Sequence, residues 1–165
     1  MHVIATDGDA DVLQLLSANA AANRSRCADE PNACGDSGVG NGGDGGVIDE
    51  ATDGSLTVAP LIWGEPKCAL TALGLTAPPS LILATGCVYS SDEGVWGHLV
   101  ETLEQLSGPA TLVVMVHGNG AAPGAQQLRG RFYELARRRF ECTRVAPHHL
   151  HAQHHGCTVA CLVRK

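Results

Sequence analysis

Four side chains that could take part in chemistry stand at or just after apolar runs of the kind that form strands. They are Asp7, Trp63, Thr85 and Tyr89. A carboxylate at the end of a strand can accept hydrogen bonds from both hydroxyls of a ribose. An indole at a neighbouring strand end can cover a purine ring by stacking. Because ligands bind at the carboxyl ends of strands in open α/β sheets, Asp7 and Trp63 predict half of a nucleoside pocket.

Each of these side chains also has a purely structural explanation. Asp7 lies in Thr6-Asp7-Gly8-Asp9, a sequence typical of turns and helix caps. Trp63 could fill the edge of a hydrophobic core, and Tyr89 could pack with its hydroxyl in water. The placement of the side chains after successive strands is what favours a shared site.

A histidine-rich segment near the end of the chain offers a second set of candidate ligands. Its members are His148, His149, His151, His154 and His155, followed by Cys157 and Cys161. Zinc sites need ligands at defined spacings on a rigid frame. This run is more typical of a polar loop between two edge strands, so we predict no metal site. A small metal-binding protein that uses this tail remains an alternative.

The elements that must position these groups alternate between strands and helices. Apolar runs predict strands over 2–5, 56–63, 80–84, 111–116, 142–146 and 157–163. Helical spacing of apolar residues predicts helices over 10–24, 95–106 and 125–140. Alternation of this kind predicts one α/β domain over 1–165 with a largely parallel sheet. The last two strands have no helix between them, which predicts an antiparallel hairpin at one edge.

Within these helices the periodicity predicts which residues face inward. The expected inward residues are Val12, Leu13, Leu16 and Ala20; then Val95, Leu99, Leu103 and Leu106; then Leu128, Phe132, Leu135 and Phe140. Asp9 or Asp11 is expected to cap the first helix. Residues 137–139, three arginines, are expected to form the solvated end of the third helix. A segment rich in Gly, Asp, Asn and Ser at about 28–54 is expected to be a flexible surface insertion.

Composition excludes several classes of protein. The chain has 165 residues, 44% of them apolar and 17% charged, and its formal net charge is −6. An acidic chain of this kind does not favour binding to the phosphate backbone of nucleic acids. The sequence contains no apolar stretch long enough for a membrane span and opens with no secretory signal. Its 7 cysteines lack CxxC spacing. This favours a reducing compartment, the cytoplasm and also the nucleus.

Several segments of the chain resemble one enzyme family. Residues 4–7 and the helix after them are similar to the second strand and following helix of the non-histone protein-lysine methyltransferases (methyltransferase family 16). Residues 61–65, Leu-Ile-Trp-Gly-Glu, resemble the Leu-x-Trp-Gly segment of that family. Residues 81–89 resemble its strand that ends in Ser/Ala-Asp-x-x-Tyr. The three motifs occur in the family's order, and the resemblance spans nearly the whole chain.

The resemblance implies a Rossmann-like, seven-strand sheet and a function as an S-adenosylmethionine-dependent protein-lysine N-methyltransferase. It implies that Asp7 binds the ribose of S-adenosylmethionine, that Trp63 lies against the adenine and that Thr85 lines the adenosine pocket. Tyr89 would shape the catalytic site where the lysine of a protein substrate meets the methyl group. The histidine-rich loop would lie near the place where such a substrate docks.

The chain departs from the family pattern in two places. Gly86 stands where the family has an aspartate at the catalytic mouth. The family's first strand and glycine-rich loop have no counterpart ahead of residues 4–7, so we expect a sheet that is incomplete at its N-terminus. Because the first strand is central in the family, its neighbours should have unpaired edges. These departures favour the alternative of a non-catalytic, methyltransferase-like domain that binds a partner protein.

Overall fold

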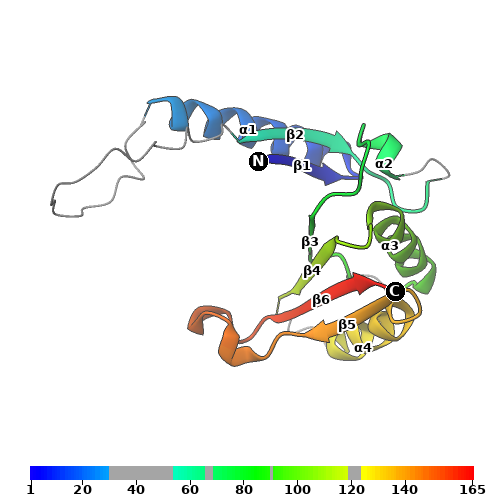
Figure 1. Ribbon diagram of the computed structural model, residues 1–165. Helices are drawn as coiled ribbons and strands as arrows, with labels where there is room; N and C mark the ends of the chain where they lie inside the picture. Colours follow the sequence, from blue (N-terminus) through cyan, green and yellow to red (C-terminus); the bar gives the residue numbers. More distant parts are fainter. Residues whose placement is uncertain (30–53, 66–68, 90, 119–123) are drawn as a thin grey trace, which may run out of the picture. The chain divides into compact units, whose positions relative to one another are not determined.

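The computed structural model describes residues 1–29, 54–65, 69–89, 91–118 and 124–165 (Figure 1). The predicted insertion at about 28–54 falls almost entirely on residues 30–53, which lie outside this range. The chain forms two compact units, Met1–Leu61 (unit 1) and Ile62–Lys165 (unit 2). A single domain over both units stays a prediction.

The described part of unit 1 contains two parallel strands and one helix. Strands β1 (His2–Asp7) and β2 (Ser55–Pro60) pair in register, from His2 opposite Ser55 to Asp7 opposite Pro60. The strand predicted over 56–63 ends early at Pro60. A proline has no N–H to continue a ladder, which suits it to a strand end.

Helix α1 (Ala10–Asp29) follows β1 directly and extends five residues beyond the predicted end at Arg24. Asp9 is its cap, because its Oδ1 accepts hydrogen bonds from the backbone N–H groups of Asp11 (2.8 Å) and Val12 (3.2 Å). Ala20 is buried as predicted, but Val12 is 38% exposed and does not face inward.

Unit 2 contains a mixed sheet in the order β3-β4-β6-β5. The strands are β3 (Leu81–Thr85), β4 (Leu112–His117), β5 (Phe140–Arg144) and β6 (Thr158–Arg164). β3 and β4 are parallel, whereas β6 is antiparallel to both of its neighbours. The α/β class and the antiparallel pairing of the last two strands are thereby confirmed.

The helices of unit 2 are α2 (Ala69–Ala72), α3 (Glu93–Leu106) and α4 (Ala125–Ala136). α3 begins at the cap Asp92, whose Oδ1 accepts the N–H of Gly94 at 2.8 Å. The connection between β5 and β6 holds two short 3-10 helices, η1 (Pro147–His149) and η2 (Ala152–His154).

One boundary in this unit differs from the sequence-based prediction. The third helix was expected to continue through Phe140, but α4 ends at Ala136 and Phe140 begins β5. The amides of Arg138 and Arg139 bond to carbonyls three residues back, so the last turn tightens and the chain then leaves the helix. Phe140 is fully buried all the same, now from a strand.

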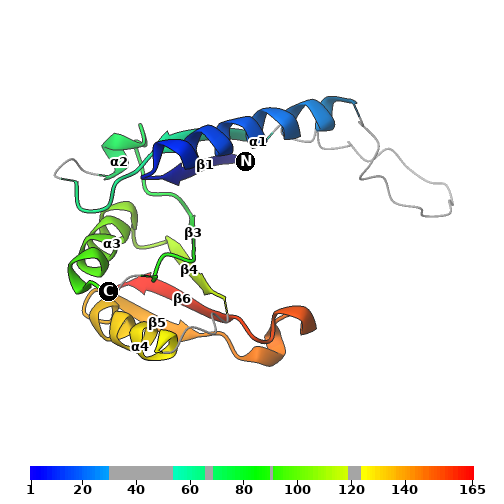
Figure 2. The same cartoon turned by 180° about the vertical axis from the view of Figure 1, so that it is seen from behind.

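The core of unit 2 lies on one face of its sheet. Figures 1 and 2 show α3 and α4 beside the strands of this sheet in two opposite views. Alternate residues of the central strands, Val113 and Met115 of β4 and Ala160 and Leu162 of β6, are buried against these helices. The buried helix residues include Trp96, Leu99, Leu103, Phe132 and Ala136.

The opposite face of the same sheet carries apolar side chains in solvent. Leu81, Leu83, Leu112 and Val163 are all exposed, with Leu83 at 68%. Among the described residues, β3 pairs only with β4, and β1 pairs only with β2. Within the described residues, β1 and β3 are therefore edge strands, as are β2 and β5. No helix in the described part of the chain is long and apolar enough to cross a membrane.

Candidate functional site

Asp7 lies at the carboxyl end of β1 and takes part in the turn into α1. Its Oδ1 accepts the backbone N–H of Asp9 at 2.9 Å, and its backbone carbonyl accepts the N–H of Leu61 at 2.9 Å. The side chain is half-buried. The structural explanation of Asp7 as a turn residue is thus correct, and the carboxylate still stands at the strand end where a ribose ligand was predicted.

Trp63 and Gly64 attach the Leu-x-Trp-Gly segment to α3. The ring of Trp63 packs partly buried against the hydrophobic core, which agrees with its structural explanation. The N–H of Gly64 donates to Oγ1 of Thr102 at 3.2 Å. Gly64 has φ 78°, and a Cβ added there would lie 2.4 Å from Cγ of His98. Only glycine therefore fits this contact without a shift.

Thr85, Gly86 and Tyr89 form the exposed turn that follows β3. The N–H of Gly86 donates to the carbonyl of Val116 at 3.0 Å, which ties the turn to the end of β4. Gly86 has φ 66°, and no atom lies within 4 Å of a Cβ built on it. The side chain of Tyr89 is 74% exposed. The turn is consequently open on the side where the family carries a carboxylate.

The structure thus brings together some of the predicted site residues. Thr85 and Tyr89 share one turn, and Trp63 belongs to the same unit. Asp7 belongs to the other unit. The roles of these four residues toward a cofactor stay predictions.

A second polar group lies at the carboxyl end of β4. His117 is 3% exposed, and its Nε2 lies 2.8 Å from the hydroxyl of Tyr133 on α4. The two rings meet edge to face with centroids 5.7 Å apart. Burial of the imidazole, aided by the nearby Arg129, lowers the pKa of His117 to about 4, so the ring is neutral at pH 7.

Tyr133 joins this pair to a cavity between α4 and the two C-terminal strands. Burial is the main reason that its pKa rises to about 12; Cys142 adds to the rise, while Arg129, Arg144 and Arg137 oppose it. Burial also raises the pKa of the Cys142 thiol, against the opposing charges of Arg137 and Lys165. The hydroxyl of Tyr133 therefore keeps its proton well above neutral pH.

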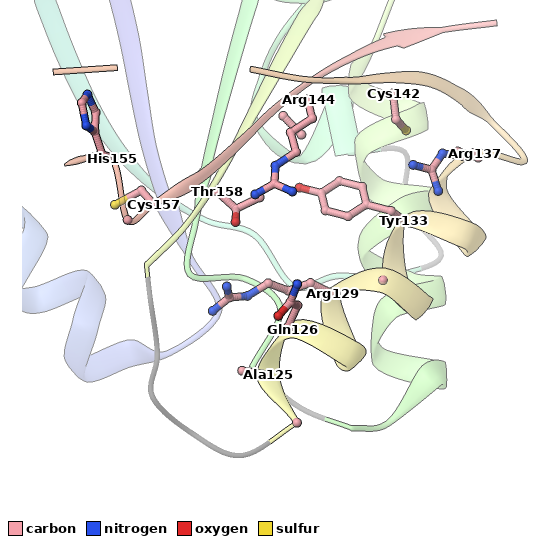
Figure 3. A pocket seen from close by; sticks show the side chains of 14 residues that line it. Ala125, Gln126, Arg129, Tyr133, Arg137, Cys142, Arg144, His155, Cys157 and Thr158 are labelled. Atoms are coloured by element: carbon pink, nitrogen blue, oxygen red, sulfur yellow. The ribbon is translucent and has the colours of Figure 1, made fainter. Parts of the chain in front are cut away.

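The cavity has a volume of about 680 Å³. α4 contributes Gln126, Arg129, Tyr133 and, at its C-cap, Arg137; β5 and β6 contribute Arg144 and Thr158, and His155 and Cys157 come from the connection between those strands. Figure 3 shows Arg129 and Tyr133 projecting from α4, with Arg144 reaching toward the tyrosine. Within the part of the chain that the structure describes, no Asp or Glu lines this cavity.

The histidine-rich connection is used for local structure. His151 caps η2, where its Nδ1 accepts the N–H of Gln153 at 3.4 Å, and His155 Nε2 lies 3.0 Å from the carbonyl of Leu150. The rings of His148 and His149 lie side by side with centroids 4.1 Å apart. Across the described ranges, no group of three or more His, Cys, Asp or Glu side chains is placed to hold a metal ion.

Sequence reasoning missed the His117–Tyr133 pair and the cavity beside it. Arg129, Tyr133 and Arg137 follow one another at intervals of four residues, so the spacing itself placed them on one face of a helix. The other residues around the cavity include Arg144 and Thr158, which belong to β5 and β6. The spacing of residues in the sequence does not show that these strands lie beside the helix. Comparison of the chain with profiles of known protein families and with curated protein sequences finds no match.

Proposed function

We propose that the chain is an S-adenosylmethionine-dependent protein-lysine methyltransferase domain built on a seven-strand sheet. The topology within each unit supports the proposal. Unit 1 holds a parallel pair, β1 with β2, and unit 2 holds the order β3-β4-β6-β5 with β6 antiparallel to both of its neighbours. The resembled family, with its central first strand, predicts an unpaired edge on β1 and on β3, and within the described residues each of these strands pairs on one side.

The carboxyl ends of parallel strands are where open α/β sheets bind ligands. β1 ends at Asp7 in unit 1, and β3 ends at Thr85 in unit 2. Two of the predicted cofactor residues therefore lie at strand ends of the kind that carry ligands.

The surroundings of these residues are compatible with the cofactor. Asp7 uses one carboxylate oxygen in a turn, which leaves acceptor capacity for ribose hydroxyls. Trp63 is only partly buried, and part of its ring can therefore face an adenine. Thr85 is exposed at the end of β3. S-adenosylmethionine, when bound, would supply a methyl group already activated on a sulfonium.

The task left to the protein is to align the acceptor amine and keep it uncharged. A lysine has a pKa near 10.4 in solution, so its ammonium must lose a proton before it can attack. Tyr89 presents an exposed ring and hydroxyl at the turn after β3, where they can orient the amine of a protein substrate. Its high exposure leaves room for a chain as large as a protein segment.

A non-catalytic, methyltransferase-like binding domain is the second candidate. It is favoured by Gly86, which puts no side chain at the position of the family's aspartate. Among the described residues, no atom lies within 4 Å of a Cβ built on Gly86, so no neighbouring group fills the space beside it. Titration with the cofactor product separates the two candidates.

The deciding experiment is calorimetric titration of the purified chain with S-adenosylhomocysteine. We expect saturable binding that Asp7→Ala and Trp63→Ala each weaken by about 1–3 kcal/mol, because each removes a direct contact. Asp7→Asn keeps a side-chain oxygen that can accept the N–H of Asp9, so the turn is preserved. Any loss of affinity in this variant then reports the contact with the ribose and not a change in the turn. Asp11→Ala, an exposed acid in the first turn of α1, is the matched control.

Three outcomes of this titration are informative. Loss of affinity in Asp7→Asn but not in Asp11→Ala supports the ribose assignment. Unchanged affinity in both Asp7→Ala and Trp63→Ala removes the pocket as assigned. A folded chain that binds no S-adenosylhomocysteine favours the non-catalytic domain.

A further inference from the structure

Three arginines gather around the cavity of unit 2. Arg129 and Arg137 stand on either side of Tyr133 along α4, at intervals of four residues, so all three share one face of the helix. Arg144 enters from β5, opposite that row (Figure 3). Eight helical residues rise by about 12 Å, so the row spans a length greater than a single small ion.

None of these arginines is neutralised by a carboxylate among the described residues. The Arg129 Nη2 donates to the backbone carbonyl of Gly118 at 2.6 Å, and neither Arg137 nor Arg144 forms an ion pair. Three other arginines of the same unit do pair with glutamates: Arg131 with Glu93, and Arg139 and Arg164 with Glu104. Of the four described arginines of this unit without an ion pair, three therefore line the cavity, and the fourth is Arg138.

This concentration is unusual for the chain, because the formal net charge is −6. Three arginines and no carboxylate of the described residues line this one hollow, so it would attract an anion. The volume of about 680 Å³ lies within the range of small-molecule sites. The cavity therefore has both the charge and the size for an anionic ligand.

We propose that this cavity binds a small phosphorylated ligand with at least two phosphoryl groups. Guanidinium groups grip phosphate oxygens through pairs of parallel hydrogen bonds, and three of them suit a ligand with more than one such group. Thr158 adds a hydroxyl donor, and Gly124 at the start of α4 leaves the backbone open to close approach. The site is separate from the turn after β3 and does not depend on the proposed methyltransferase function.

The choice of phosphate over an acidic peptide follows from the lining. Its charged groups are all donors, and they come from a helix and from a strand on the other side of one hollow instead of following a single extended element. A compact group with several oxygens can contact donors placed in this way better than single carboxylates spaced along an extended chain. The phosphoryl groups could belong to a nucleotide or to free pyrophosphate, and the experiment separates these sources.

The test is calorimetric titration of the whole chain with pyrophosphate at fixed ionic strength. We expect saturable binding that Arg129→Gln and Arg144→Gln each weaken by about tenfold or more, because each removes charge-assisted hydrogen bonds. Arg138→Gln is the matched control. It removes the same charge from an exposed arginine that does not line the cavity. The affinity of this control variant should change by less than about twofold.

Further measurements identify the class of ligand and check that each variant is folded. Arg144→Lys keeps the positive charge but lacks the planar guanidinium that can form two parallel hydrogen bonds. If these paired bonds matter, this variant should bind pyrophosphate more tightly than Arg144→Gln but more weakly than the unchanged chain. Tighter binding of a nucleoside triphosphate than of pyrophosphate would assign the phosphoryl groups to a nucleotide. Equal weakening in Arg138→Gln, absence of pyrophosphate binding by the folded chain, or preferential binding of an oligoglutamate peptide would each overturn the proposal. Circular dichroism of every variant verifies that the fold is kept.

Discussion

The His117–Tyr133 pair illustrates how one buried polar residue is held in a hydrophobic sheet. His117 lies on the face of β4 that packs under the helices, where Val113 and Met115 are its neighbours along the strand. A buried imidazole needs a hydrogen-bond partner, and the hydroxyl of Tyr133 supplies it at 2.8 Å. The neutral ring avoids the cost of an unpaired buried charge, which is why its pKa is low.

This pair predicts how the stability of unit 2 depends on pH. The pKa of His117 is about 4 in the folded chain and 6.5 for an exposed histidine. Between these values the unfolded chain binds a proton that the folded chain does not. Stability is therefore complete above about pH 6.5 and falls as the pH drops toward 4. Linkage gives a loss of about 2 kcal/mol at pH 5, measurable by urea unfolding at pH 5 and pH 7.

The variant His117→Gln isolates this contribution. Glutamine keeps a polar group within reach of Tyr133 but does not titrate. The difference in free energy of unfolding between pH 5 and pH 7 should shrink by about 2 kcal/mol in the variant. An unchanged difference would show that other groups cause the pH dependence.

At the residue scale, sequence reasoning worked where the cause was local. Asp9 as the cap of α1 could be predicted, because a cap contacts amides two and three residues on. Tyr133 with His117 could not be predicted, because the pair joins a helix to a strand end 16 residues away. The three unpaired arginines were missed for the same reason, because only the fold shows which arginines form ion pairs and which do not.

At the element scale, the contact between the Leu-x-Trp-Gly segment and α3 determines how unit 2 begins. Gly64 lies against His98 and bonds to Thr102, one helical turn further along α3. The positive φ of Gly64 and the lack of room for a Cβ both require glycine. The family motif therefore has a packing explanation here that is independent of any ligand.

Two glycine substitutions test this contact. Gly64→Ala should destabilise unit 2 by about 1–3 kcal/mol, because it adds a clash and a strained φ. Gly97→Ala, in the middle of α3 with no atom within 4 Å of its Cβ, should stabilise the unit by about 0.5–1 kcal/mol. Urea unfolding followed by the fluorescence of Trp63 and Trp96 measures both changes. Equal effects of the two substitutions would contradict the packing role of Gly64.

Periodicity predicted the centres of elements better than their ends. The apolar run of β4 and the inward face of α3 were both found, because burial acts on every second or every third and fourth residue. The end of α4 was missed because Phe140 continues the helical spacing even though it belongs to β5. Phe140 is buried whether it belongs to a helix or to a strand. The spacing of apolar residues alone could therefore not locate the end of α4.

At the scale of the whole molecule, the α/β class followed from alternation, but the strand order did not. β6 lies between β4 and β5, so the last strand of the chain is internal and the one before it forms the edge. The division into two units also has no signature in local spacing. Both depend on contacts between segments that are distant in the sequence. Such contacts cannot be derived from the local spacing of residues in a single sequence.

The unpaired edge of β3 has a consequence for amide exchange with solvent. Gly86 donates to Val116, and Ser80 accepts from Leu112, so even-numbered residues of this strand face β4. The amides of Leu81, Leu83 and Thr85 point the other way. In hydrogen–deuterium exchange we expect protection to alternate along β3, with Ile82 and Ala84 slow and their neighbours fast. Pairing of another strand at that edge would erase the alternation, so this single segment reports whether the edge of β3 is occupied in solution.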